Sequence, residues 1–507
     1  MKYLYGALLI LLSWGALAEE AKPKVAESLQ ELQLQIAAEV KEKKLPGVQL
    51  ALFDKNGVYW SAEFGIRDKE KQLSLEPDTL MRAGSTTKTF VSLAIMQLIG
   101  EGKFELQAKL QDIAPEVKID NPWRKQYPVR VVHLLEHTAG FDDMHFRNFY
   151  NVNELDISLL DAVNRDATAL KVRWQPGTMH SYSNPGYGIL GYLIEKYSGQ
   201  KHEDYLQQNI LKPIGMSNSS LRFNKTVEAK LSQGFSDGEA VVHREIYLRS
   251  AGSLYTTAID LAKVGHFLLT EAKSAQLEMI NADVIHSMEH ASTTLSGKSG
   301  LDYGYGRGVY QAIRGNRLWY GHNGGLDGFF SSYGYSRQFG QGYALMLNSS
   351  SDSVKKLLTL ITQFLAKDVP FVAQNPVEGI DPSINGYYRI RNSRNEILAG
   401  VDLALNVVKL VAKGDKLIAK PLIGDDVELI HVGQQQFKDK DNEVATAIFI
   451  ENTEGNKAFE IDGQYFIQTN FLLAWLPIVF IATRFFNDHL DNVFVSIFLF
   501  FPHWQDS

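Results

Sequence analysis

The pattern of apolar and polar positions divides the chain into two parts of different character. Over residues 26–44 apolar side chains recur at helical spacing, and residues 47–65 alternate like two strands joined by an Asn-Gly turn. Mainly helical segments follow up to about residue 230. Strand-like segments lie between residues 316 and 350, and residues 357–369 have the pattern of a closing helix. This order predicts an α/β sandwich with a helical subdomain over residues 26–369.

Beyond residue 369 the pattern changes to short alternating stretches. Residues 370–385 contain three prolines and little periodicity, which favours a linker. Residues 386–467 contain short stretches in which apolar and polar residues alternate, separated by turns that pair Gly with Asp or Asn. This pattern predicts a small all-β domain, a barrel or a sandwich. The hydrophobic tail, residues 468–507, includes residues 471–486, which carry one charge and approach the ~20 residues of a spanning helix. We expect a membrane anchor there, the alternative being a buried or interfacial helix.

The start of the chain has the pattern of an export signal. Lys2 precedes an apolar run ending in Ala16-Leu17-Ala18, which predicts a signal peptide over residues 1–18. The alternative, an uncleaved anchor, needs a longer apolar run. The chain has no cysteine, which excludes disulfides and a cysteine nucleophile, and its formal net charge of -7 argues against a nucleic-acid partner. These features predict an exported bacterial protein, in the periplasm or on the outer face of the cytoplasmic membrane.

Ser85 and Lys88 stand three residues apart at the start of an apolar run. No charged residue occurs from Thr89 to Gly100, so this segment predicts a buried helix. Positions three apart share a helix face, with Cβ atoms ~5–6 Å apart. A lysine in apolar surroundings has a lowered pKa, and its neutral amine can take the proton of a serine hydroxyl. The pair predicts a nucleophile with its base, the alternative being a helix N-cap beside a solvent-reaching lysine.

Two further short motifs point to the same chemistry. Tyr182-Ser183-Asn184 lies in a loop that enters an apolar helix. A phenol beside an ammonium favours its phenolate form, so Tyr182 is a second candidate base. Asn184 offers a donor and an acceptor to an amide-like substrate. The alternative is a loop tyrosine followed by an N-cap asparagine. His322-Asn323-Gly324 follows a strand-like segment, where glycine lets a substrate lie against the strand edge. We expect the N–H groups of Ser85 and Gly325 to form an oxyanion hole.

In this order the three motifs resemble those of the serine beta-lactamase and penicillin-binding-protein superfamily. The resemblance is to the branch of class C beta-lactamases, D-alanyl-D-alanine carboxypeptidases and related esterases, and flanking segments 129–141 and 251–264 are similar too. It covers about residues 28–365. It implies a beta-lactamase/transpeptidase-like sandwich, with a lipocalin-like barrel as the appended β domain. It also implies that Ser85 is acylated, that Lys88 and Tyr182 transfer protons, and that Asn184, His322 and Gly324 hold the substrate.

One position departs from the pattern of the beta-lactamases. They carry lysine where this chain has His322, and a histidine is mostly neutral at pH 7 without a partner that raises its pKa. Efficient beta-lactam hydrolysis is therefore not expected. We expect a serine hydrolase that forms an acyl-enzyme on an ester or amide, such as a D-amino-acid peptide, an ester or a beta-lactam-like compound. The expected partner is this small-molecule or peptide substrate, with no cofactor and no metal.

Other patterns in the chain compete with this interpretation. Ser198/Lys201 and Ser353/Lys356 repeat the Ser-x-x-Lys spacing, but neither leads into an uncharged helix. A second His-x-Gly begins at His431, in the β domain.

Three rival functions are considered beside the serine hydrolase. Residues 133–137 match the zinc pattern His-x-x-Glu-His, although no third ligand is evident. Residues 234–238 match the nucleophile elbow Gly-x-Ser-x-Gly, but a strand-like segment follows, so a hairpin turn is the simpler interpretation. The third rival is a non-catalytic or slowly acylating envelope sensor or peptidoglycan-binding module of the same fold.

Overall fold

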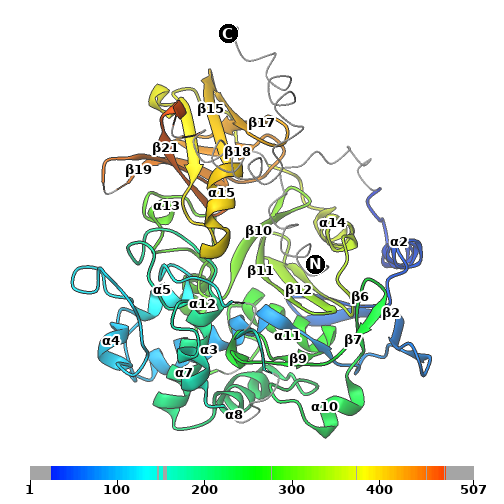
Figure 1. The fold of residues 1–507 in the computed structure, drawn as a ribbon. Helices are drawn as coiled ribbons and strands as arrows, with labels where there is room; N and C mark the ends of the chain where they lie inside the picture. The colour runs from blue at the N-terminus through cyan, green and yellow to red at the C-terminus, as the bar shows by residue number, and fades with distance from the viewer. Residues whose placement is uncertain are drawn as a thin grey trace, which may run out of the picture.

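Figure 1 shows the fold in a computed structural model of the protein. The structure describes residues 24–145, 148–151, 157–275, 277–372, 374–452, 454–472 and 474. The expected signal peptide and nearly all of the expected hydrophobic tail lie outside the described residues. Within them, no helix combines the length and the apolar character that crossing a membrane requires.

A seven-stranded antiparallel sheet forms the centre of the larger part of the molecule. Its strand order is β10-β11-β12-β13-β1-β2-β3. The strands are β1 (Gly47–Asp54), β2 (Gly57–Asp68), β3 (Leu73–Ser74), β10 (Tyr310–Arg314), β11 (Arg317–Leu326), β12 (Phe329–Ser336) and β13 (Gln341–Leu347). The expected hairpin is confirmed, because β1 pairs with β2 around a turn in which the Asn56 N–H donates to Asp54 Oδ1 at 2.7 Å. The pairing of β1 with β13 joins the two ends of this part of the chain.

Helices cover both faces of the sheet, as Figure 1 shows. On one face, α2 (Leu29–Glu42) and α14 (Ser353–Ala366) pack on apolar side chains such as Leu50 and Leu345. On the other face lies a larger core that contains α3 (Thr87–Gly100), α7 (Asn184–Ser198) and α11 (Ala258–Leu269). Because α3 is buried nearly along its whole length, its apolar residues face neighbours on every side.

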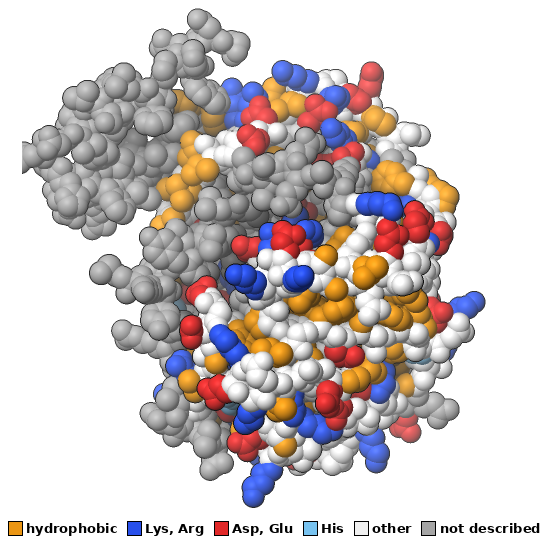
Figure 2. All heavy atoms as spheres, turned by 90° about the vertical axis from the view of Figure 1, so that its right-hand side faces the viewer, with side chains coloured by type: hydrophobic (Ala, Val, Ile, Leu, Met, Phe, Trp, Pro, Cys, Tyr) orange, Lys and Arg blue, Asp and Glu red, His pale blue; other side chains and the backbone are white. Residues whose placement is uncertain are grey.

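Shorter elements complete this part of the chain. The helical segments are α4 (Leu110–Ile113), α5 (Val131–Leu135), α6 (Leu159–Asn164), α8 (His202–Leu206), α9 (Lys212–Ile214), α10 (Lys225–Lys230), α12 (Ala282–Glu289) and α13 (Leu295–Lys298). Three two-stranded sheets pair β4 (Met81–Arg82) with β9 (Tyr255–Thr256), β5 (Tyr150–Asn151) with β8 (Glu245–Ile246), and β6 (Gly234–Ser236) with β7 (Glu239–Val241). On the face that Figure 2 presents, acidic and basic side chains are interspersed.

The C-terminal part is a closed barrel of eight strands in sequence order. They are β14 (Gly386–Ile390), β15 (Val407–Lys413), β16 (Lys416–Pro421), β17 (Val427–His431), β18 (Gln436–Asp439), β19 (Ala447–Glu451), β20 (Lys457–Ile461) and β21 (Gln464–Thr469). The connection from β14 to β15 contains α15 (Ala399–Leu405), which lies on the side of the barrel that faces the sheet in Figure 1. The fold class expected from the sequence, an α/β sandwich with a C-terminal all-β barrel, is therefore confirmed.

An apolar layer joins the barrel to the larger part. Met179 and Leu301 from the larger part pack with barrel residues that include Ile448, Ala458 and Tyr465. This layer is separate from the core inside the barrel. The barrel is thus packed against the rest of the molecule rather than attached only through the chain at residues 370–385.

Candidate active site

Lys88 lies buried beside Ser85 at the start of α3. Ser85 belongs to the 3-10 turn η2 (Gly84–Thr86), which leads directly into the helix. The Lys88 side chain has no exposed surface, and its Nζ lies 3.1 Å from Ser85 Oγ, 2.8 Å from Asn184 Oδ1 and 2.7 Å from the Ala251 carbonyl oxygen. A neutral amine has two N–H groups for the two carbonyl oxygens. Its lone pair then faces the hydroxyl of Ser85.

The charges around Lys88 act on its pKa in both directions. Burial lowers this pKa well below its ordinary value, because a buried ammonium loses its hydration. The Asp143 carboxylate opposes the shift, and the Arg394 guanidinium adds to it. The net effect favours the neutral amine, the form of lysine that can accept a proton from Ser85.

Tyr182 lies next to the same pair, but its surroundings disfavour a phenolate. Burial raises its pKa, and the nearby Ser85 hydroxyl only partly opposes this. Lys88 Nζ lies 4.9 Å from the centre of the ring, and the Tyr182 hydroxyl has no hydrogen-bond partner among the described residues. Tyr182 is therefore a neutral phenol at rest, with its hydroxyl free for a substrate or for a proton relay.

Asn184 connects Lys88 to an acidic residue that the sequence did not single out. It is the first residue of α7, and both its backbone N–H and its side-chain Nδ2 donate to Asp143 Oδ1 at 3.0 Å. These bonds fix the amide so that Oδ1 accepts from Lys88. Asp143 thus orients Asn184 as well as acting on Lys88 through its charge.

The turn that carries Ser85 packs tightly against the end of β11. A Cβ on Gly84 would lie 2.9 Å from Gly325 N, and one on Gly324 would lie 1.9 Å from Ala83 O and 2.8 Å from Ser85 N. Only glycine allows this approach. The backbone around Ser85 therefore lies directly against that of Gly324 and Gly325, a closeness that the expected oxyanion hole requires.

The side chain of His322, a candidate for holding the substrate, does not line the cavity at Ser85. It is buried, with Nε2 2.8 Å from the Tyr305 hydroxyl and Nδ1 bonded to the Asn323 carbonyl. Burial lowers its pKa to about 3, and the charge of Lys88 adds to the shift. Both ring nitrogens of this neutral imidazole are occupied within the protein, so the side chain offers no donor to a substrate carboxylate in this conformation.

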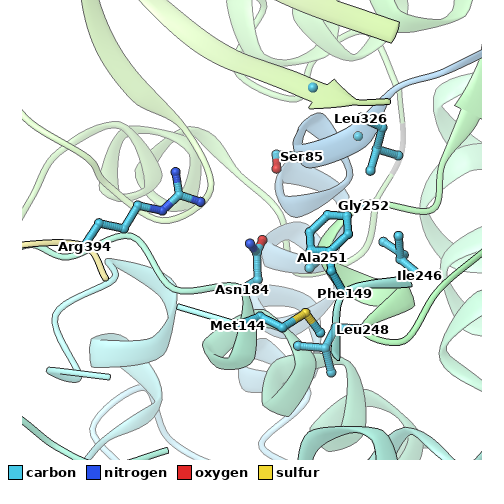
Figure 3. A pocket seen from close by; sticks show the side chains of 12 residues that line it. Ser85, Met144, Phe149, Asn184, Ile246, Leu248, Ala251, Gly252, Leu326 and Arg394 are labelled. Atoms are coloured by element: carbon cyan, nitrogen blue, oxygen red, sulfur yellow. The ribbon is translucent and has the colours of Figure 1, made fainter. Parts of the chain in front are cut away.

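The cavity beside Ser85 has an apolar wall and a polar wall. Its volume is about 180 Å³, and it is lined by Gly84, Ser85, Met144, Phe149, Asn184, Ile246, Leu248, Ala251, Gly252, Gly325, Leu326 and Arg394. Figure 3 shows Arg394 across the cavity from Leu326 and Ile246, with Ser85 and Asn184 between them. Among these lining residues, only Arg394 carries a charge, and it comes from the connection between β14 and β15.

The comparisons with known proteins fit this geometry. The family model Beta-lactamase matches residues 32–365. The chain belongs to the beta-lactamase family. Protein flp of Staphylococcus aureus (strain MRSA252) is 24% identical over 66% of this chain and 65% of its own length. The unguisins hydrolase ungD of Aspergillus violaceofuscus is 23% identical over 61% of this chain and 59% of its own length.

Solved structures share the fold of this beta-lactamase family member. The octameric penicillin-binding protein homologue from Pyrococcus abyssi covers 87% of this chain and 100% of its own, with a TM-score of 0.58 and 22% identity. SurE with D-Leu covers 87% of this chain and 99% of its own, with a TM-score of 0.56 and 19% identity. The family membership supports a serine hydrolase. The chain spans about 65% of the length of the flp relative from strain MRSA252.

The rival motifs have other roles in this family member. In the zinc pattern His133 and His137 would be ligands on one helix face and Glu136 the base, but α5 ends at Leu135, so the two histidines do not share a face. Glu136 accepts from the backbone N–H groups of Ser292 and Thr293 and pairs with Arg307. Within the described residues, the one group arranged to hold a metal ion is Glu195, His202 and Glu203, where the histidine lies between the two carboxylates.

The remaining motifs are likewise explained by the fold. Residues 234–236 form β6 and residues 237–238 form the turn into β7, as expected for a hairpin. Ser198 ends α7 and donates to the Ile194 carbonyl, while Lys356 pairs with Glu39. His431 is buried in β17 with Nδ1 against the Val377 carbonyl.

Two residues at the site were not predicted from the sequence. Asp143 follows the flank at residues 129–141, and Arg394 lies in a basic stretch after β14, but neither belongs to a motif. They are 251 positions apart, and only the docking of the barrel brings them together.

Proposed function

We propose that this chain cleaves an ester or amide through an acyl-enzyme on Ser85. Lys88 takes the hydroxyl proton, the N–H groups of Ser85 and Gly325 stabilise the oxyanion, and the neutral Tyr182 relays a proton to the leaving group. The observation that carries the proposal is the contact of 3.1 Å between Ser85 Oγ and the fully buried Nζ of Lys88. Burial lowers the pKa of Lys88 well below its ordinary value, which is the direction that a general base needs.

The substrate class we propose is a D-amino-acid peptide or a related ester, as in carboxypeptidases and esterases of this fold. One relative is an unguisins hydrolase, and the structure of SurE, which has a similar fold, was solved with D-Leu. Efficient beta-lactam hydrolysis is not part of the proposal, because His322 is neutral and both its ring nitrogens are occupied.

We also propose that the protein works in the bacterial envelope. The signal-like pattern of residues 1–18 and the apolar segment 471–486 support export and attachment to a membrane.

Intact-protein mass after mixing with a fluorophosphonate, with a penicillin and with a short-chain p-nitrophenyl ester tests the proposal. We expect one fluorophosphonate adduct per chain and turnover of the ester. Ser85→Ala should lose both, with a drop in kcat/KM of about 10³-fold or more, and its circular dichroism should match the wild type. Labelling and turnover that persist in the folded Ser85→Ala variant would refute the assignment. If no probe labels the wild type, the non-catalytic binding module takes its place.

A further inference from the structure

Among the described residues that line the active-site cavity, the only charged one comes from the barrel. Arg394 belongs to the segment between β14 and α15, and its side chain is 45% exposed, in contrast to that of Asp143, which is 8% exposed. In Figure 3 its guanidinium extends into the space beside Ser85 and Asn184. The opposite wall, which includes Ile246 and Leu326, is apolar.

The backbone that carries Arg394 is fixed to the larger part of the molecule by several hydrogen bonds. Arg173 donates to the carbonyl oxygens of Ser393 at 2.8 Å and of Arg394 at 3.3 Å. The Glu396 N–H donates to Asp142 Oδ1 at 2.9 Å, and Asn392 Nδ2 donates to the His180 carbonyl at 2.7 Å. A side chain on so constrained a segment is pre-organised, which lowers the entropic cost of binding through it.

The guanidinium itself has one edge occupied and one edge free. Its Nε and Nη2 both donate to Asp143 Oδ2, at 2.9 and 2.6 Å, and its central carbon lies 4.8 Å from the centre of the Tyr182 ring. Nη1 has no hydrogen-bond partner among the described residues. A planar guanidinium presents several donors in a fixed geometry that matches a carboxylate, so it can hold Asp143 on one edge and an incoming anion on the other.

The imidazole of His322 is not available to bind an incoming anion. It is buried, neutral and bonded through both nitrogens, whereas Arg394 lines the cavity and keeps its charge. Lys88 is a second basic residue beside Ser85, but it is fully buried and needed as a neutral base.

We propose that Arg394, supplied by the barrel, binds a carboxylate of the substrate while Ser85 attacks the scissile carbonyl, so that the enzyme selects acidic over neutral esters and amides. This inference rests on the proposed function, since it assigns a substrate group to the same cavity. The rival explanation is that Arg394 only positions Asp143, and through it Asn184.

Two matched substrate pairs separate binding from positioning. The first pair is p-nitrophenyl hydrogen glutarate and its methyl ester, with the carboxylate in the acyl group. The second is 4-(butanoyloxy)benzoate and its methyl ester, with the carboxylate in the leaving group. The measured quantity is the ratio of kcat/KM for the acid to that for its methyl ester, which cancels any general loss of activity.

We expect Arg394→Gln to lower this ratio by about tenfold or more for at least one pair, because a charged hydrogen bond is lost. Arg394→Lys should retain part of the preference. Arg391→Gln, the loss of an exposed arginine from the same segment, should leave the ratio and the activity unchanged. Asp143→Asn should keep or increase the preference, because it frees the guanidinium, although its overall rate changes.

Three outcomes have distinct meanings. A ratio that Arg394→Gln leaves unchanged for both pairs overturns the proposal. Equal losses on acids and methyl esters in Arg394→Gln and Asp143→Asn assign Arg394 a positioning role and also overturn it. Failure of the wild type to hydrolyse any of the four esters contradicts the proposed function itself, which the fluorophosphonate labelling of Ser85 tests separately.

Discussion

Lys88 has no exposed surface, yet two charges of opposite sign act on it from nearby. Asp143 raises its pKa and Arg394 lowers it, while burial sets the overall direction downward. Because Asp143 and Arg394 also bond to each other, the two effects partly cancel in the intact protein. The basicity of Lys88 therefore depends on a residue in each of the two parts of the molecule.

The pH dependence of the reaction should respond to these two charges with opposite signs. Lys88 accepts a proton only when neutral, so kcat/KM rises with pH through its pKa. Arg394→Gln removes a charge that lowers this pKa, and the rising limb should move to higher pH. Asp143→Asn removes a charge that raises it, and the limb should move to lower pH, each by a few tenths to about one pH unit. Rates on a neutral p-nitrophenyl ester from pH 5 to 9 measure this, and shifts in the same direction would contradict it.

At the scale of elements, the contact between η2 and β11 sets the position of the nucleophile. Gly84 adopts a φ of +56°, which glycine tolerates better than other residues, and it packs against Gly325. The Ser331 hydroxyl donates to the Ala83 carbonyl at 2.6 Å and so ties β12 to the same turn. Ser85 is held between a helix start and two strands rather than on a free loop.

A methyl group at Gly324 should break this contact. In Gly324→Ala the added Cβ would lie 1.9 Å from the Ala83 carbonyl oxygen, so η2 must move away from β11. We expect a loss of about 1–3 kcal/mol in the free energy of unfolding and a severe fall in turnover. Gly325→Ala is the matched control for stability, because its Cβ meets no atom within 4 Å. Urea unfolding of the two variants measures the difference, and equal stabilities would show that the contact adapts.

The elements also show which parts of the site a sequence can predict. Ser85 and Lys88 stand three residues apart at the start of an uncharged run, so the sequence predicts both their contact and the burial of α3. The partner of His322 Nε2 does not follow from the motif, because Tyr305 lies on another segment. Asp143 and Arg394 carry no local pattern, and their contact exists only because the barrel docks beside the cavity.

At the scale of the whole molecule, the barrel is joined to the larger part through the apolar layer around Met179 and Leu301. The carboxyl group of Glu460 is buried where the two parts meet. Glu460 on β20 is 5% exposed, and its Oε2 has no hydrogen-bond partner among the described residues. Burial raises its pKa to about 7, and a hydrogen bond to Ser296 on α13 opposes the shift only in part. The folded protein therefore holds a proton that the unfolded chain releases above its ordinary carboxyl pKa.

This proton makes the stability of the docked molecule fall as pH rises. Between the ordinary pKa of 4.5 and about 7 the native state binds the proton and the unfolded state does not, so the free energy of unfolding declines through that window and levels off above it. Glu460→Gln should remove this decline. The free energy of unfolding of the variant should therefore rise relative to that of the wild type by about 2–3 kcal/mol between pH 5 and pH 8. Asp462, whose burial raises its pKa to about 6, leaves a smaller decline in both proteins. Urea unfolding at pH 5, 6, 7 and 8 measures the difference, with exposed Glu451→Gln as the control. A gap between wild type and Glu460→Gln that does not change with pH would mean that Glu460 is ionised in the folded protein.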